Sequence, residues 1–121
     1  MEQRSARGHL GRFGEDAAID HYRRQGYRLL ARNWTCSLGE LDLVLQRGGL
    51  LVFCEVKARS GSAFGGPYEA VTWRKQRKLR ALAGAFLVAS RLNPDGIRFD
   101  VASVTLEPGG TPSVFVFESA F

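Results

Sequence analysis

Two acidic residues and a lysine near the middle of the chain have the types and spacing that bind a divalent metal ion. They are Asp42, in Gly39-Glu40-Leu41-Asp42, and Glu55 and Lys57, in Glu55-Val56-Lys57. Carboxylate oxygens are the ligands that Mg²⁺ prefers in proteins. A cation held this way activates water and neutralises phosphate oxygens. The pattern therefore indicates hydrolysis of phosphodiester bonds.

The pair Gly48-Gly49 predicts how these residues meet, because it joins two apolar runs and is typical of a tight hairpin. If it forms a two-residue turn, Asp42 lies opposite Glu55. Lys57 shares the face of Glu55, because alternate side chains of a strand point the same way. Opposed carboxylates repel each other, and a cation between them removes the conflict. We expect Mg²⁺ or Mn²⁺ there, with the backbone carbonyl of Val56 as a further ligand.

Lys57 then positions or deprotonates the attacking water, or stabilises the developing negative charge. The alternative is a simple neighbour pair of Glu55 and Lys57, with Asp42 solvated near a strand end, since isolated Glu-x-Lys triplets are abundant. Glu15 could reach the same edge of the sheet as a third carboxylate or through a metal-bound water. Its alternative is a surface glutamate one helical turn from Arg12.

The chain is basic, with a net charge of +5 and only three lysines among its 17 basic residues. Arginine suits phosphate geometry, so this balance favours a nucleic-acid partner. Arg59 could hold a phosphate near the metal. A basic run opens the second expected helix, and its alternative is a solvated helix face. The run supplies the remaining candidate phosphate contacts: Arg74, Lys75, Gln76, Arg77 and Lys78.

The elements that must position these residues follow from apolar spacing and from turn residues. Helices are expected over residues 8–25 and 72–91, the second capped by Thr72, with a further helical stretch opening at Pro67. Strands are expected over 27–33, 40–46, 50–57, 97–106 and 113–118, and loops or turns over 58–66 and 93–96. The expected core positions of the helices are Leu10, Phe13, Ala17, Ala18, Tyr22, Leu79, Leu82, Ala83 and Phe86.

This order predicts an α/β fold, with a mixed five-stranded sheet and flanking helices in the order α-β-β-β-α-β-β. The length suits a single domain over residues 1–121. Gly11 and Gly14 stand where a helix prefers alanine, which indicates close approach by another backbone or a ligand. Asp100 is expected to pair with an arginine in a structural role.

Several classes of protein are disfavoured. No apolar run approaches the length that spans a bilayer, and the N-terminus does not resemble a signal peptide, so we expect a cytoplasmic protein. Cys36 and Cys54 make neither a disulfide framework nor a thiolate zinc cage, and are expected to be reduced and mostly buried. His9 and His21 show no spacing for a nucleophile–base system.

Together these motifs resemble the YraN-like family of small bacterial proteins, which is predicted to be endonuclease-related. The resemblance rests on Gly11–Ala17, Gly26-Tyr27, Asn33, Gly39–Asp42, Phe53–Arg59, Lys75 and Arg98–Val101. It implies a restriction-endonuclease-like core of the PD-(D/E)xK type, distantly similar to archaeal Holliday-junction resolvases. It also implies site positions at Glu15, Asp42, Glu55, Lys57 and Lys75. Leu41 replaces the usual proline, and Cys54 replaces a more usual valine.

Three hypotheses follow. The first is a Mg²⁺- or Mn²⁺-dependent endonuclease that cuts DNA, including branched or damaged DNA. The second is a non-catalytic nucleic-acid-binding module on a nuclease fold, in which the basic helix matters more than the carboxylates. The third is a protein-interaction factor that only shares the fold. Related folds often pair to cut two strands, so a homodimer is the expected assembly.

Overall fold

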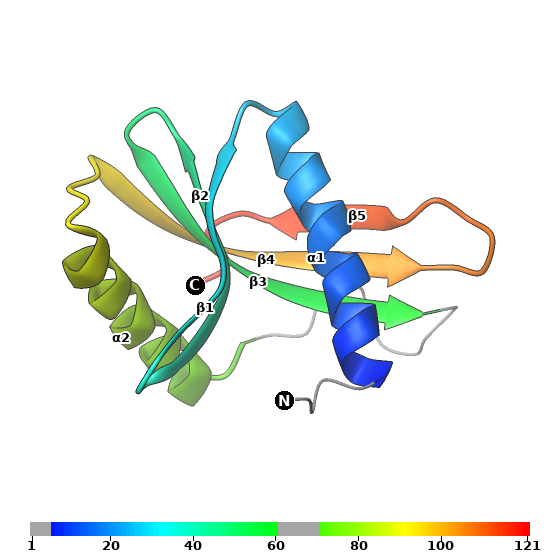
Figure 1. Cartoon of the computed structure of the whole chain (residues 1–121), viewed down its shortest axis with the longest axis horizontal. Helices are drawn as coiled ribbons and strands as arrows, with labels where there is room; N and C mark the ends of the chain where they lie inside the picture. Colours follow the sequence, from blue (N-terminus) through cyan, green and yellow to red (C-terminus); the bar gives the residue numbers. More distant parts are fainter. Residues whose placement is uncertain (1–5, 61–70) are drawn as a thin grey trace.

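The computed structural model describes residues 6–60 and 71–121, with side chains from residue 10 onward. Two helices and five strands follow one another in the order α-β-β-β-α-β-β, which confirms the expected order (Figure 1). The elements are α1 (Ala6–Arg24), β1 (Arg28–Cys36), β2 (Gly39–Arg47), β3 (Leu50–Ser60), α2 (Trp73–Ser90), β4 (Gly96–Leu106) and β5 (Ser113–Phe117).

The strands form one mixed sheet in the order β1-β2-β3-β4-β5. All neighbours are antiparallel except β3 and β4, which run parallel and are connected through α2. A parallel pair needs a long crossover, and a helix commonly provides it. The strand that carries Glu55 and Lys57 is therefore the central one, and the expected α/β fold with a mixed sheet is confirmed.

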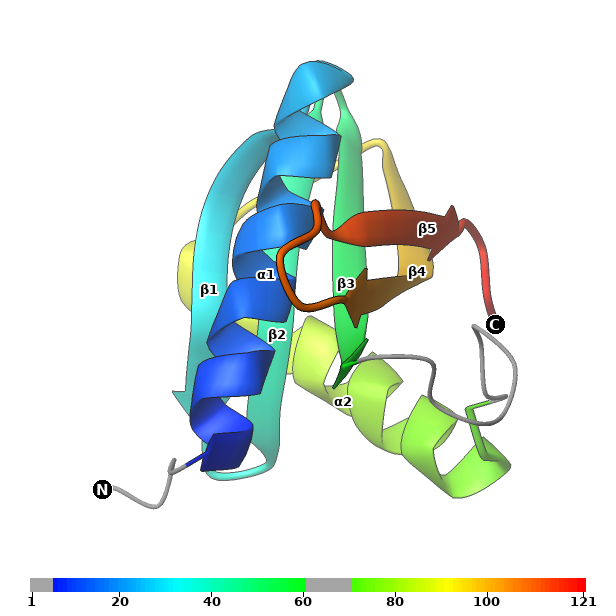
Figure 2. The same cartoon turned by 90° about the vertical axis from the view of Figure 1, so that its right-hand side faces the viewer.

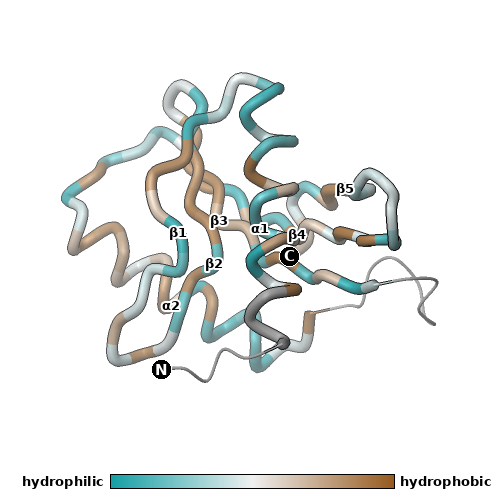
Figure 3. Tube along the Cα trace, turned by 45° about the vertical axis from the view of Figure 1, so that its right-hand side comes forward, coloured by the Kyte–Doolittle hydropathy of each residue, from teal (hydrophilic) through white to brown (hydrophobic). Residues whose placement is uncertain are grey.

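The two helices cover opposite faces of this sheet (Figure 2). Alternate residues of β3 pack on different helices: Phe53 lies in the cluster of α2, and Cys54 lies in the cluster of α1. Figure 3 shows the hydrophobic residues that run along β2 and β3 between the helices. Burial on both faces explains why β3 reads as a nearly continuous apolar run.

The hairpin at Gly48-Gly49 forms as predicted, with Arg47 paired to Leu50. Gly48 has a φ of +59°, a conformation that glycine adopts without strain. The helix over residues 73–90 also forms: the Thr72 hydroxyl accepts a hydrogen bond from the Lys75 N–H, and Leu79, Leu82, Ala83 and Phe86 are buried.

Some expected boundaries were wrong. β1 extends to Cys36, and β3 continues to Ser60, so residues 58–60 are strand rather than loop. The rest of that loop and the stretch at Pro67 lie outside the described residues. Phe13 is 63% exposed, although it was assigned to the core. Gly14 lies on the side of α1 that faces the sheet. Because glycine has no apolar side chain, the spacing of apolar residues did not show that this position is buried.

No helix in residues 6–60 and 71–121 combines the length and the hydrophobicity needed to cross a bilayer.

Candidate functional site

Asp42 and Glu55 lie where the ladder between β2 and β3 ends. The last paired residues are Leu43 and Cys54, and the two acids follow immediately on their strands. The Asp42 carboxylate accepts a 2.9 Å hydrogen bond from the backbone N–H of Val56. A side chain therefore continues the connection between the strands one step beyond the backbone ladder, and it brings Asp42 to the Glu55-Val56-Lys57 segment.

The two carboxylates are close enough to affect each other's charge. Burial, followed by the negative charge of Glu55, raises the pKa of Asp42 to about 7. The hydrogen bond from Val56 acts in the opposite direction, and Glu15 and Glu40 add smaller contributions that also raise the pKa. The two carboxylates therefore repel each other at the end of the β2–β3 ladder. The hairpin register predicted this repulsion.

Lys75 reaches this pair from the first turn of α2. Its ammonium nitrogen lies 2.7 Å from a Glu55 carboxylate oxygen. Burial lowers the pKa of Lys75, but the hydrogen bond and charge of Glu55, with the charge of Asp42, outweigh it and leave that pKa raised. Lys75 therefore lies on a carboxylate of the candidate site, and its contact with phosphate stays a prediction.

Lys57 lies two residues after Glu55 on β3, and its side chain is close to that of Lys75. The N–H and C=O of one residue in an extended strand point to the same side. Because the Val56 N–H points toward Asp42, the Val56 carbonyl also faces the β2 side, where the ladder has ended. The structure therefore brings Asp42, Glu55, Val56, Lys57 and Lys75 together.

Glu15 lies on the edge of this group. It accepts hydrogen bonds of 3.0 Å from the Arg32 guanidinium and 2.9 Å from the Asn33 amide, and its side chain is only 12% exposed. It is thus neither a solvated glutamate nor an unpaired third carboxylate. Asn33 has a φ of +53°, a left-handed conformation that asparagine tolerates better than most residues. Our sequence reasoning gave Asn33 and Arg32 no role at the site.

Close packing of α1 on β3 positions Glu15. A Cβ built at Gly14 would lie 2.6 Å from the Cβ of Ala58, so only glycine lets the helix approach this closely. The expectation of close approach by another backbone is confirmed at Gly14. At Gly11 a Cβ would meet nothing within 4 Å among the described residues, and close approach by a ligand there stays a prediction.

The other predicted phosphate contacts are spread over two elements. Arg74, Arg77 and Lys78 are exposed on α2, where an anionic backbone could reach them. The Gln76 amide donates instead to the Val71 carbonyl oxygen, which fixes the start of the helix. Arg59 is partly buried on β3, beyond Lys57 and opposite Thr105 of β4.

Asp100 has the structural role that we expected. It is fully buried and accepts two hydrogen bonds of 2.8 Å from the Arg98 guanidinium. The Tyr22 hydroxyl and the Ser119 N–H donate to the same carboxylate. Because burial and nearby charges raise the pKa of Tyr22 far above its usual range, the hydroxyl stays protonated and donates. This network ties α1 to the C-terminal segment.

The described residues contain no group of three or more His, Cys, Asp and Glu side chains placed to hold a metal ion. A divalent ion would therefore depend on two carboxylates, a backbone carbonyl, and water or phosphate. Mg²⁺ is commonly held by one or two carboxylates together with waters and substrate phosphates. Cys36 and Cys54 are both free thiols, and Cys54 is buried.

Fold and site together define a small α/β protein with an acidic pair and two lysines at the end of a central hairpin. Residues 14–104 match the family described as "Uncharacterised protein family UPF0102". Relatives named "UPF0102 protein" are 47% identical in Frankia alni, 46% in Clavibacter michiganensis and 43% in Pseudomonas syringae. These alignments cover 92–98% of this chain and 94–98% of the relatives. The chain belongs to the UPF0102 family, the YraN-like family that its motifs resemble.

Proposed function

We propose that this protein is a metal-dependent endonuclease that hydrolyses phosphodiester bonds of DNA, with branched or damaged DNA among its substrates. The observation that carries the proposal is the juxtaposition of Asp42 and Glu55 at the end of the β2–β3 ladder, where burial and then the charge of Glu55 raise the pKa of Asp42 to about 7. Two hard oxygen ligands that repel each other fit a site for Mg²⁺ or Mn²⁺.

The donor set favours a hard cation over zinc, because no thiolate or imidazole accompanies these carboxylates in the described residues. Asp42 and Glu55 would hold the cation, with the Val56 carbonyl on the same side of β3. When bound, such a cation lowers the pKa of its water and neutralises phosphate oxygens. The 2.9 Å bond from the Val56 N–H keeps Asp42 oriented toward the site.

The lysines would serve the substrate. Lys57 follows Glu55 on the central strand, where it can orient the attacking water or stabilise charge that develops on the phosphate. Lys75, which lies on Glu55 in this structure, would be available to a phosphate oxygen if a cation took its place on that carboxylate. Glu15, held by Arg32 and Asn33, adds a fixed negative charge behind Asp42.

One observation favours the alternative, a non-catalytic nucleic-acid-binding module. Lys75 already neutralises Glu55, and Arg32 already neutralises Glu15, so two of the three acids have cationic partners without a metal. In that module the exposed Arg74, Arg77 and Lys78 would bind the DNA backbone. Its binding would weaken with salt and would not require a divalent ion.

Cleavage of plasmid, single-stranded and four-way-junction DNA with Mg²⁺ or Mn²⁺ tests the proposal. The active-site variants are Asp42→Asn and Lys57→Ala, and the controls are Asp20→Asn and Arg23→Ala, which remove charges of the same sign from exposed positions of α1 that we assign no role in the site. We expect the first pair to lose at least about a hundredfold in rate, because general acid–base groups and charge stabilisers contribute that much. The controls should keep cleavage.

Cleavage that survives both active-site variants would come from a contaminant and would contradict the proposal. Metal-independent binding without cleavage, unchanged in Asp42→Asn, would instead support the binding module.

A further inference from the structure

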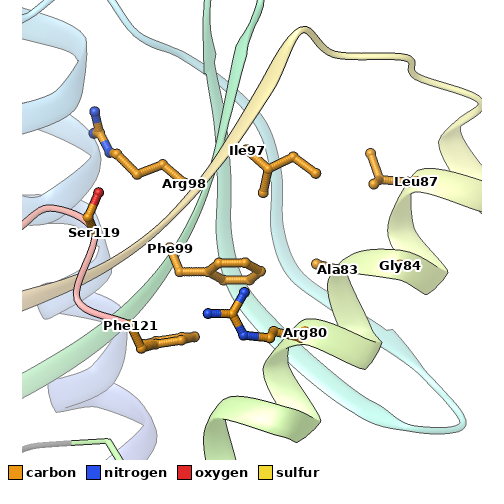
Figure 4. A pocket seen from close by; sticks show the side chains of 9 residues that line it. All are labelled: Arg80, Ala83, Gly84, Leu87, Ile97, Arg98, Phe99, Ser119 and Phe121. Atoms are coloured by element: carbon orange, nitrogen blue, oxygen red, sulfur yellow. The ribbon is translucent and has the colours of Figure 1, made fainter.

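A pocket of about 440 Å³ lies between the second half of α2 and the start of β4 (Figure 4). Gly84 and Leu87 line it from the helix, and Ile97 and Phe99 line it from the strand. Phe99 also lines a small cavity that reaches Asp42 and Glu55. The pocket and the candidate metal site therefore lie on two sides of one aromatic side chain.

Arg80 forms one edge of this pocket. Its guanidinium carbon lies 4.9 Å from the ring centroid of Phe99 and 5.5 Å from that of Phe121, and the two rings stack on each other (Figure 4). In the part of the chain that the structure describes, no carboxylate pairs with Arg80, whereas Arg98 nearby is bonded to Asp100. The pocket is thus bordered by a planar cation that lies over two aromatic rings and pairs with no carboxylate of residues 10–60 and 71–121.

Gly84 indicates that the pocket is shaped for a ligand. Glycine destabilises the interior of a helix relative to alanine, so a glycine there calls for a reason in packing or function. A Cβ at Gly84 would meet nothing within 4 Å, so the packing of this chain does not require glycine. At Gly14, by contrast, a Cβ would lie 2.6 Å from Ala58. The missing side chain leaves a flat wall one helical turn after Arg80, with room for a planar group.

The same side of α2 carries two more residues that suit a nucleic acid. Trp73, Arg77, Arg80 and Gly84 follow one another at intervals of four, three and four residues, which places them in one stripe. Trp73 is 70% exposed, and Arg77 is also exposed. The stripe begins at Trp73, in the same first turn of α2 as Lys75, which projects from the other side of the helix onto Glu55, and it ends at the pocket.

We propose that this pocket takes an unpaired nucleobase from a single-stranded segment of nucleic acid whose backbone follows the stripe from Trp73 to Arg80. Bases stack on aromatic rings and on arginine guanidinium planes, and neighbouring arginines bind phosphates. The apolar walls at Leu87 and Ile97 receive the base, and Arg80 stacks on it. This inference rests on the proposed function, from which we take the ligand to be DNA. It adds that the substrate has an unpaired strand next to the cleavage site.

The test compares a labelled thymidine oligonucleotide with an abasic strand of the same length, by fluorescence anisotropy with EDTA present so that no cleavage occurs. We expect the strand with bases to bind about tenfold more tightly, from stacking in the pocket. Gly84→Leu fills the pocket and should remove this preference. Ala81→Leu enlarges an exposed residue of α2 that does not line the pocket, and should keep it.

Arg80→Lys keeps the positive charge but removes the planar guanidinium. It should reduce the preference for the strand with bases, while the salt dependence of binding stays the same. A Gly84→Leu protein that melts like the wild type and still prefers bases tenfold would overturn the inference. A nucleoside monophosphate that competes as well as the oligonucleotide would overturn the assignment to a strand.

Cleavage assays separate the two proposals. If no DNA is cut but the base preference is lost in Gly84→Leu, the nuclease proposal fails and the pocket assignment stands. If Gly84→Leu cuts single-stranded flanks as fast as the wild type, the pocket assignment fails and the nuclease proposal stands.

Discussion

The ammonium nitrogen of Lys75 on α2 lies 2.7 Å from a carboxylate oxygen of Glu55 on β3. This contact joins the first turn of a helix to the central strand, and it places a positive charge beside the acid that would ligate a metal. We therefore expect a cation at Glu55 to compete with Lys75 for this carboxylate. The first prediction follows from this competition.

Replacing Lys75 with glutamine should increase the affinity for Mn²⁺ severalfold, because the competing ammonium is removed. The side chain of Lys75 is 41% exposed, so the ion pair stabilises the metal-free protein by only on the order of 1 kcal/mol. Isothermal titration calorimetry measures the change. Lys78→Gln removes the same charge from an exposed position of α2 and should leave the Mn²⁺ affinity nearly unchanged. Equal effects from both variants would mean that Lys75 affects metal binding only through the overall positive charge of α2, and not through its contact with Glu55.

The pKa of Asp42 predicts how stability depends on pH without metal. Its folded value of about 7 lies above the ordinary carboxyl value of 3.8, so ionising Asp42 costs free energy of folding. The cost is absent below about pH 4, grows up to about pH 7 and is complete above it, at on the order of 4 kcal/mol. Urea unfolding in EDTA at several pH values measures it.

Asp42→Asn is the control for this slope, because an amide oxygen still accepts the hydrogen bond from Val56 but carries no charge. We expect the variant to be more stable than the wild type at neutral pH without metal, and to bind Mn²⁺ much more weakly. A variant that loses stability at every pH would show that the Asp42 charge stabilises the hairpin.

Gly14 and Gly11 form a matched pair on α1. Gly14→Ala should destabilise the protein by about 1–3 kcal/mol, because the new methyl group would overlap Ala58 and push the helix off β3. Gly11→Ala should stabilise it by about 0.5–1 kcal/mol, since the position is open and alanine favours helix. Thermal melts compare the two. Gly14→Ala should also displace Glu15 and slow any cleavage, whereas Gly11→Ala should not.

Asp100→Asn should destabilise the protein by about 3–5 kcal/mol, because it leaves the Arg98 charge without its fully buried partner. Tyr22→Phe removes one hydrogen bond from the same carboxylate and should cost only about 1 kcal/mol. Chemical denaturation ranks the two variants. DNA binding by the folded fraction should be unchanged in both, and a selective loss of binding in Asp100→Asn would contradict a purely structural role.

The sequence by itself determined the order of the elements and the position of the hairpin. Apolar periodicity and the Gly48-Gly49 pair are local signals, and they were enough to place Asp42 and Glu55 side by side. Phe13 shows the limit of such signals. Gly14 lies on the side of α1 that faces the sheet and has no hydrophobic side chain, so Phe13 was wrongly predicted to be buried in its place, whereas Ala18 and Tyr22 of the same helix are buried as predicted.

Only the tertiary structure decided the partners of the charged residues. Lys75 and Glu55 are twenty residues apart in sequence, and the crossover through α2 brings them together. Glu15 meets Arg32 and Asn33 because α1 lies close against the sheet, at a distance that Gly14 permits. The packing of whole helices and strands decides which charged side chains meet. The spacing of residues within one element does not contain that information. The residue types of the site were therefore readable from the sequence, and their charge balance was not.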